Sequence, residues 1–143
     1  MINREEIVKT ARTWLGTRFR YQGRIKINKK NKGGVDCLGL IFGVCDEVGY
    51  KYNGKLLSKY DNVVYSNNPD YSILREKFSK FFYVKEVKDI GAGDIVLKQV
   101  SKTQFHLMFY TGKTFIHASA ITFNVVEHLI DNLDNCIVYS MFE

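Results

Sequence analysis

The chain has 143 residues, of which 45% are hydrophobic and 25% charged, and its formal net charge is +6. This length and composition indicate one globular domain over residues 1–143 with a core of its own. No apolar run approaches the roughly 18 residues of a membrane span, and the charged residues 1–6 do not resemble the apolar core of a signal peptide. We therefore expect synthesis in the cytoplasm, followed by assembly into a larger particle or export without a cleaved signal.

Three helices are predicted in the first part of the chain. Residues 3–15 carry apolar side chains on one helical face, and Asn3 can cap the start of that helix. Residues 37–47 form the second predicted helix and residues 71–82 a third, shorter one. The polar residues 50–70 between them are predicted to be an irregular connection.

The pattern changes to strands from residue 84 onward. Runs of β-branched and aromatic residues predict strands at 95–97, 105–110, 114–118, 125–129 and 137–142. Thr111 and Gly112 are expected to form a two-residue hairpin loop. Helices that precede a sheet in the chain predict an α+β fold, with N-terminal helices packed on a four- to six-stranded antiparallel sheet.

Cys37 occupies a position suited to a nucleophile. Two glycines at 33–34 allow a tight turn into Asp36 and Cys37, and an amphipathic helix begins at once behind them. Unpaired N–H groups at a helix start favour a thiolate and should lower the pKa of Cys37. Asp36 is expected to be a turn and cap residue. Cys45 and Cys136 are expected to serve as small hydrophobic residues, since the cysteine spacing matches no metal or CxxC motif.

His106 and His117 are the candidate base and its orienting partner. With a two-residue loop they would stand directly opposite one another on one face, with Cβ atoms about 4.5–5.5 Å apart; a register slip of one or two residues remains an alternative. His106 would then take the proton of Cys37, and His117 would fix the tautomer of His106. The backbone N–H of Cys37 is the expected first oxyanion donor. His128 has no such context and is expected to be a surface or structural residue.

Four motifs in order resemble those of the NlpC-type cell-wall cysteine peptidases: Gly-Gly-Val-Asp-Cys-Leu-Gly-Leu at 33–40, Gly-Asp-Ile-Val-Leu at 93–97, His-Leu-Met-Phe-Tyr at 106–110 and Phe-Ile-His-Ala at 115–118. Residues 11–17 and 21–23 are most similar to the branch of this family found in phage tail gene clusters. The resemblance implies a papain-like α+β fold and hydrolysis of amide bonds in peptidoglycan stem peptides, typically after D-Glu. It also implies Cys37, His106 and His117 as the catalytic triad. We expect no metal and no cofactor.

The chain departs from the family pattern near the cysteine. Leu38 stands where the family usually has Ser or Ala, and Arg18 and Phe19 stand where it often has Pro-Tyr. The tyrosine at the position of Phe19 is a candidate oxyanion donor in the family, and phenylalanine cannot donate. Tyr21 is the candidate replacement, and Asp36 is a further candidate for the oxyanion or substrate site.

Five of the nine residues at 24–32 are cationic. This segment is expected to be either a solvated loop or a contact for an anionic cell-envelope polymer. It lacks the interleaved aromatic residues that stack on bases, so nucleic acid is not an expected partner. The expected partners are peptidoglycan stem peptides, together with phage tail proteins if the resemblance to the tail-associated branch holds.

Three other functions remain open from the sequence. The chain could be a catalytically silent tail, scaffold or wall-binding protein with the same fold. It could keep the chemistry but act as a cysteine amidase or acyltransferase on a non-wall substrate. Cys37, His106 and His117 are also residue types that bind zinc, although their spacing fits no usual zinc ribbon or finger.

Overall fold

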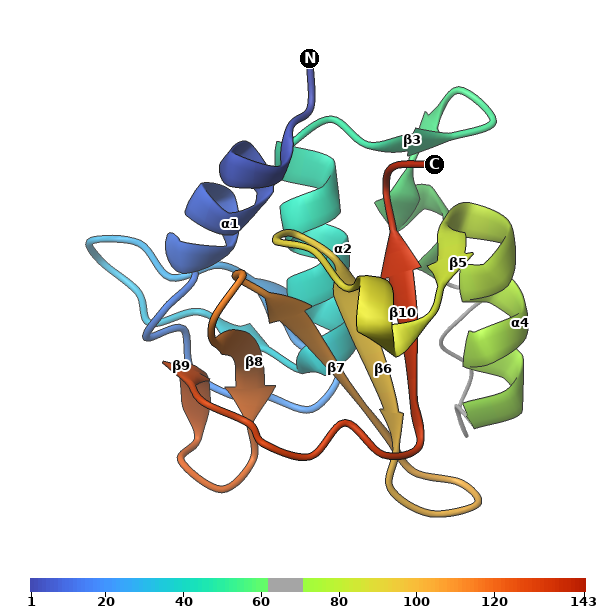
Figure 1. The fold of residues 1–143 in the computed structure, drawn as a ribbon. Helices are drawn as coiled ribbons and strands as arrows, with labels where there is room; N and C mark the ends of the chain where they lie inside the picture. Colours follow the sequence, from blue (N-terminus) through green and yellow to red (C-terminus); the bar gives the residue numbers. More distant parts are fainter. Residues whose placement is uncertain (62–70) are drawn as a thin grey trace.

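In the computed structural model, which describes residues 1–61 and 71–143, three α-helices lie on one side of an antiparallel sheet (Figure 1). The helices are α1 (Arg4–Arg12), α2 (Cys37–Glu47) and α4 (Tyr71–Phe81). The six strands, in spatial order, are β5 (Tyr83–Lys85), β10 (Cys136–Ser140), β6 (Ile95–Gln99), β7 (Phe105–Tyr110), β8 (Phe115–Ser119) and β9 (Asn124–His128). The predicted α+β architecture is confirmed.

The ends of the first two helices follow local sequence signals. The side chain of Asn3 accepts a hydrogen bond from the Glu6 N–H at 2.8 Å, which is the predicted N-cap. The first helix ends at Arg12 rather than at residue 15, because turns that close onto Thr10 and Ala11 replace its last predicted residues. The second helix spans the predicted residues and is followed by Gly49, whose φ of 80° is the left-handed conformation that glycine adopts readily.

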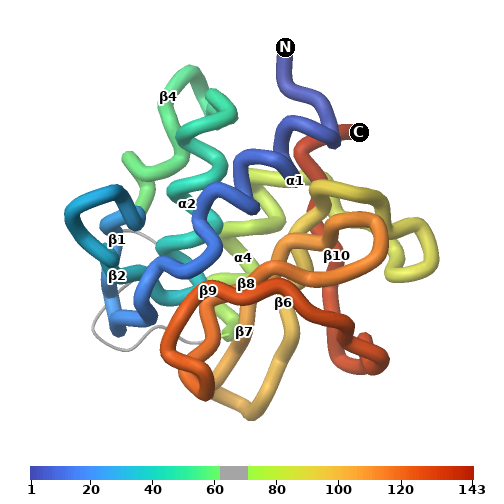
Figure 2. Tube along the Cα trace, turned by 90° about the vertical axis from the view of Figure 1, so that its left-hand side faces the viewer, coloured from blue at the N-terminus to red at the C-terminus, as the bar shows by residue number. Residues whose placement is uncertain are grey.

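The main core lies between the helices and one face of the sheet. Leu107 and Phe109 of β7 face this core, as do Leu40 and Ile41 of α2, and all four are completely or almost completely buried. Figures 1 and 2 agree in placing α1 beside α2 above this face. Burying side chains of this size stabilises the fold by about 1.5–3 kcal/mol each. This packing fixes the position of α2 relative to β7.

The opposite face of the sheet carries a smaller apolar cluster. It contains Val96, Met108 and Phe115, all at most 3% exposed, with Ile130 and Leu133 packed against it. Side chains alternate between faces along a strand, so His106 belongs to the face of Met108 and His117 to the face of Phe115. Both faces of the central strands are therefore covered.

The hairpin between β7 and β8 differs from its prediction. Its turn has four residues, in which the Thr111 N–H donates to the Thr114 carbonyl at 2.9 Å. Phe109 pairs with Ile116, two positions away from the predicted register. A change of two residues preserves the face, because side chains repeat every second residue. His106 and His117 therefore stay on one face without being directly opposite.

The sequence did not reveal the shortest elements. A hairpin joins β1 (Arg24–Ile25) to β2 (Gly34–Val35), and the basic segment at 24–32 lies within it. The predicted irregular connection at 50–70 contains, in its described part, β3 (Lys51–Tyr52), β4 (Lys55–Leu56) and the 3-10 helix η1 (Leu57–Tyr60). Its residues 62–70 lie outside the described part. A second 3-10 helix, η2 (Val87–Asp89), follows β5.

No helix in the described ranges is long and apolar enough to cross a membrane.

Candidate active site

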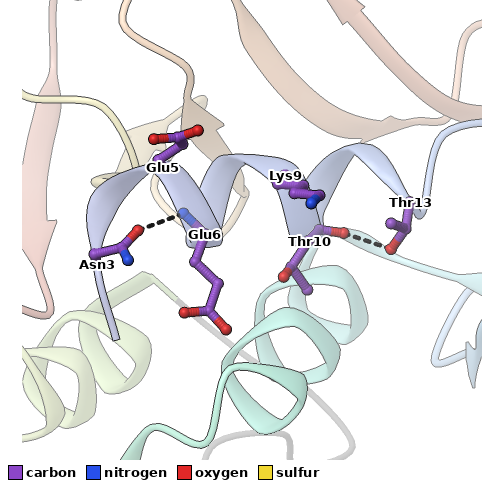
Figure 3. Close-up of a pocket in the computed structure, with 6 residues that line it drawn as sticks. All are labelled: Asn3, Glu5, Glu6, Lys9, Thr10 and Thr13. Carbon is purple, nitrogen blue, oxygen red and sulfur yellow. Dashed lines mark hydrogen bonds between the residues drawn. The ribbon is translucent and has the colours of Figure 1, made fainter. Parts of the chain in front are cut away.

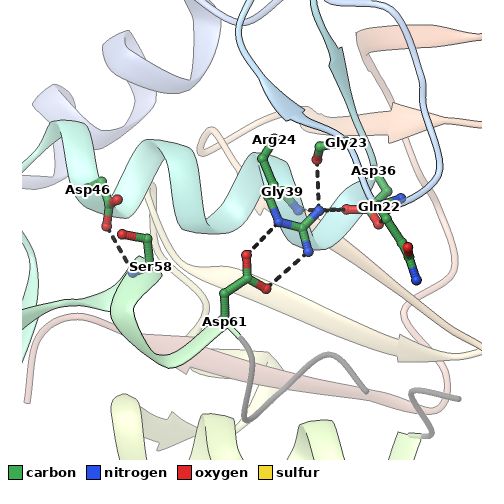
Figure 4. Close-up of polar contacts among 8 residues, drawn as sticks. All are labelled: Gln22, Gly23, Arg24, Asp36, Gly39, Asp46, Ser58 and Asp61. Atoms are coloured by element: carbon green, nitrogen blue, oxygen red, sulfur yellow. Dashed lines mark hydrogen bonds and ion pairs between the residues drawn. The ribbon is translucent and has the colours of Figure 1, made fainter. Parts of the chain in front are cut away.

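Asp36 anchors the start of α2 and the turn ahead of β1. Its side chain is the N-cap of the helix and accepts the Gly39 N–H at 2.7 Å. The same carboxylate accepts the Gln22 N–H at 3.0 Å and pairs with Arg24 at 2.8 Å (Figure 4). Arg24 also pairs with Asp61, again at 2.8 Å. Asp36 is only 4% exposed, and both of its oxygens are engaged, so it holds the local structure around the cysteine.

Gly39 allows this turn to lie directly on the helix. A Cβ atom at Gly39 would stand 2.3 Å from the carbonyl oxygen of Gly23, which belongs to the backbone and cannot rotate away. The contact of Gly23 with the first turn of α2 therefore requires a glycine at position 39. This gives a physical reason for the glycine two residues after Cys37 in the motif.

Cys37 is the first residue of α2, as predicted, but its protonation differs from the prediction. Burial, and then the negative charge of Asp36, raise the pKa of the Cys37 thiol to about 12. Interactions of the sulfur with the backbone of Leu107 and Leu38, and the charge of Arg24, lower it by less. The predicted lowering of the pKa is therefore wrong, because the loss of hydration outweighs the favourable dipoles at the helix start.

The structure brings the two predicted histidines together. His106 Nε2 and His117 Nδ1 are 2.7 Å apart, and the two rings are almost perpendicular. This bond uses Nε2 of His106, so Nδ1 is the ring nitrogen that His117 does not engage. His106 is half-buried, whereas His117 is only 7% exposed.

His128 continues this line of imidazoles; it lies on the surface as predicted, but its contact with His117 was not predicted. His117 Nε2 lies 2.6 Å from His128 Nε2, although His128 itself is exposed on the edge strand β9. Each histidine is separated from the next by 11 residues. Two successive hairpins of similar length place such residues side by side, and this equal spacing was the signal in the sequence.

Both inner histidines are neutral at pH 7. Burial, and then the charge of Lys98, its direct partner in the β6–β7 ladder, lower the pKa of His106 to about 4. Burial also lowers the pKa of His117 to about 4, with smaller contributions from the neighbouring histidines. A neutral imidazole is the form that can accept a proton.

Cys37 approaches the histidines through the backbone of β7. Its sulfur interacts with the backbone of Leu107, the residue directly after His106. Within the described residues, no hydrogen bond joins the Cys37 sulfur to His106. Contacts between catalytic groups are often long before substrate binds and tighten in the complex.

Tyr21 is less closely tied to the site. It is 67% exposed in the turn ahead of β1, next to Gln22, whose N–H is held by Asp36. The backbone next to Tyr21 is therefore held by the same carboxylate that caps α2.

The histidine contacts are hydrogen bonds and not a metal cage. Two imidazole nitrogens on one tetrahedral zinc would stand about 3.3 Å apart, because each Zn–N bond is about 2.0–2.1 Å; the pairs here are 2.7 and 2.6 Å apart. Among the residues that the structure describes, no group of three or more His, Cys, Asp or Glu is placed to hold a metal ion. The zinc-module alternative gains no support.

The basic segment at 24–32 divides into two parts. Arg24 is engaged by two carboxylates, and Lys26 pairs with Glu47 at 2.9 Å and lies over the ring of Trp14. The remaining cations are exposed and form no ion pair with a described residue; this exposed lysine cluster consists of Lys29, Lys30 and Lys32.

A shallow groove on α1 lies apart from the candidate catalytic residues (Figure 3). Its lining comes from the exposed turns of the helix and includes Asn3, Glu6 and Thr13. None of the candidate catalytic side chains lines it.

No protein-family model matches the sequence, and no curated protein matches it. Solved structures with the same fold do exist. The NlpC/p60 domain of the peptidoglycan hydrolase SagA matches with a TM-score of 0.66 and 20% identity, over 98% of this chain and 100% of that one. The peptidoglycan hydrolase RipB from Mycobacterium tuberculosis matches with a TM-score of 0.67 and 15% identity, over 98% of this chain and 65% of that one. An NlpC/p60 family protein from Bacillus cereus matches with a TM-score of 0.69 and 13% identity, over 99% of this chain and 41% of that one.

These matches identify the architecture. The chain has the NlpC/p60 fold, so the predicted papain-like fold of the NlpC type is confirmed. It spans the whole SagA domain but only 65% of the RipB chain. The similarity to the phage-tail branch stays a prediction.

Proposed function

We propose that residues 1–143 form a cysteine peptidase of the NlpC type that hydrolyses amide bonds in peptidoglycan stem peptides. The observation that carries this proposal is the hydrogen bond between His106 of β7 and His117 of β8. The backbone of Leu107, next to His106 on β7, contacts the Cys37 sulfur. The fold supports it as well, because SagA and RipB are described as peptidoglycan hydrolases. Cys37 is the nucleophile, His106 the general base, and His117 orients His106.

The raised pKa of Cys37 and the lowered pKa of His106 define the starting state. A thiol with a pKa of about 12 beside an imidazole with a pKa of about 4 stays neutral, so no thiolate–imidazolium pair exists before substrate binds. The sulfur therefore loses its proton to His106 Nδ1 as it attacks the carbonyl carbon. His106 next gives this proton to the leaving amine as the C–N bond breaks. Water then hydrolyses the thioester, with His106 again as the base, and the free thiol returns.

The oxyanion needs donors that point at the attacked carbonyl. The backbone N–H of Cys37 is the first, because the leading N–H groups of a helix have no partner within it. The Tyr21 hydroxyl is the proposed second donor, in place of the tyrosine that the family often has at the position of Phe19. Asp36 contributes by holding the neighbouring Gln22 N–H, and thereby the turn that carries Tyr21.

The test is digestion of defined muropeptides with the product masses read by mass spectrometry. Cys37→Ala should abolish product formation and leave the melting temperature nearly unchanged. Cys45→Ala is the matched control, since it removes a buried thiol elsewhere on the same helix and should leave the chemistry intact. Tyr21→Phe should slow turnover by about 100-fold if its hydroxyl binds the oxyanion. Full activity of Cys37→Ala would rule out this cysteine as the nucleophile.

The same digests determine which bond is cut. Cleavage after D-Glu is the proposed specificity, and the product masses identify the bond directly.

Association with a phage or prophage tail is proposed from the similarity of residues 11–17 and 21–23 to the tail-associated branch. Mass spectrometry of purified tail particles would detect the chain there, and its absence from tails made by a producing strain would contradict this association.

The exposed lysine cluster supports a contact with an anionic cell-envelope polymer. Its three cations lie on the loop between β1 and β2, the hairpin that is tied to the start of α2 through Arg24 and Asp36. Cations placed there attract a polyanion toward this end of the molecule over about 8 Å at physiological salt.

One pair of observations favours a second candidate, a catalytically silent wall-binding or scaffold protein with the same fold. The raised pKa of Cys37 leaves very little thiolate, and no hydrogen bond within the described residues joins the sulfur to His106. One experiment distinguishes the peptidase from the silent protein. A silent protein binds intact sacculi equally well with Cys37 or with alanine at that position and releases no product from either muropeptides or sacculi.

A further inference from the structure

The line of imidazoles extends one residue beyond the proposed triad. The nitrogen of His117 that does not contact His106 lies 2.6 Å from His128 Nε2. The β8–β9 ladder places Phe115 opposite His128 and His117 opposite Val126, so both histidines project from the same face. The ladder of the two strands therefore fixes this contact, and it does not depend on a loop.

The tautomer of each ring determines that of the next, because His106 and His117 each donate one hydrogen bond toward His128. A general base needs a free lone pair on His106 Nδ1, so the proton of neutral His106 is on Nε2 and is donated to His117 Nδ1. His117 then carries its own proton on Nε2 and donates it to His128 Nε2. This assignment leaves every close N···N contact with one donor and one acceptor.

We propose that His128 is a positioning residue of this site. By accepting the His117 Nε2–H, it holds His117 in the tautomer that accepts from His106, and so keeps Nδ1 of His106 free for the proton of Cys37. His128 touches neither substrate nor sulfur in this role and acts only through His117. The role in turnover and the assigned direction of proton donation rest on the proposed function, whereas the contact between His117 and His128 does not.

The alternative tautomer explains why an acceptor is needed at position 128. Without one, His117 can place its proton on Nδ1, where it faces His106 Nε2. His106 must then accept at Nε2 and carry its proton on Nδ1, which removes the base from the side of the sulfur. A side chain at position 128 that accepts a hydrogen bond should therefore preserve activity, and an apolar one should not.

The experiment compares His128→Leu with His128→Gln, whose amide oxygen can accept the same hydrogen bond. Leu129→Ala is the matched control, because Leu129 is 66% exposed and directly follows β9. We expect kcat on a defined muropeptide to fall about tenfold in His128→Leu with KM unchanged, the size of effect that one hydrogen bond supplies. His128→Gln should stay within about threefold of the wild type, and Leu129→Ala should be unchanged.

A second measurement reads the tautomer itself, through the 15N chemical shifts of the His117 ring. The wild type and His128→Gln should carry the His117 proton on Nε2, and His128→Leu should show a mixture of tautomers. Unchanged shifts in His128→Leu would overturn the proposal, as would full activity of that variant when the wild type is active. If the wild type releases no product, the proposed peptidase function fails, and the 15N shifts alone then support or refute the positioning role.

Discussion

Acid should destabilise the folded chain in part through His106, because this ring is protonated less readily when folded than when unfolded. Burial, and then the charge of Lys98, lowers the pKa of His106 from its ordinary value of 6.5 to about 4. The unfolded chain therefore binds a proton between these values and the folded chain does not. The stabilisation is fully present above pH 6.5 and is lost as the pH falls toward 4. Between these two pKa values the free energy of unfolding falls by about 1.4 kcal/mol per pH unit, which gives a total loss of about 3 kcal/mol.

Urea denaturation at pH 7, 6, 5 and 4.5 measures this effect for the wild type and for His106→Gln. The glutamine variant should show a shallower loss of unfolding free energy, so that the two curves converge as the pH falls. Groups that do not contact His106 are present in both proteins and cancel in the difference. Parallel curves across this pH range would refute the reasoning.

Three further predictions concern the surroundings of the site. Asp36→Asn should shift the pH dependence of Cys37 alkylation to lower pH, since the Asp36 charge raises the pKa of that thiol; an unchanged profile would contradict this. Cys45→Ala should lower the unfolding free energy in urea by about 1–3 kcal/mol, because the side chain is completely buried. Replacing the exposed lysine cluster by glutamines should weaken binding to intact sacculi and flatten its salt dependence, while turnover of a small uncharged muropeptide stays the same. Equal losses on both substrates would mean that the loop shapes the site itself.

Local patterns in the sequence were enough to predict the start of α2. The cap at Asp36 depends only on neighbouring residues and lies where the pattern indicates. The alternation along β7 and β8 likewise predicts His106 and His117 on one face. This prediction is correct although the loop is two residues longer than predicted, because a shift of two residues keeps the same face. Features that repeat with the backbone geometry can thus be predicted without knowing the packing.

Properties that depend on packing between distant segments could not be predicted. The pKa of Cys37 depends on how completely α2 and β7 exclude water from the sulfur, and no local pattern carries that information. The contact of His128 depends on the pairing of β8 with β9, which the sequence left open. Arg24 was grouped with the surrounding lysines by charge alone, although in the fold it is held between Asp36 and Asp61.

The burial of the Cys37 thiol also bears on its chemical lifetime. Oxidants attack the thiolate, and the raised pKa of Cys37 keeps the thiolate a very small fraction of the total at pH 7. Conversion to sulfenic acid should accordingly be slow, which the loss of intact Cys37 in dilute hydrogen peroxide, followed by mass spectrometry, would measure. A nucleophile that ionises only as it attacks its substrate can persist in an oxidising environment without a supply of reductant.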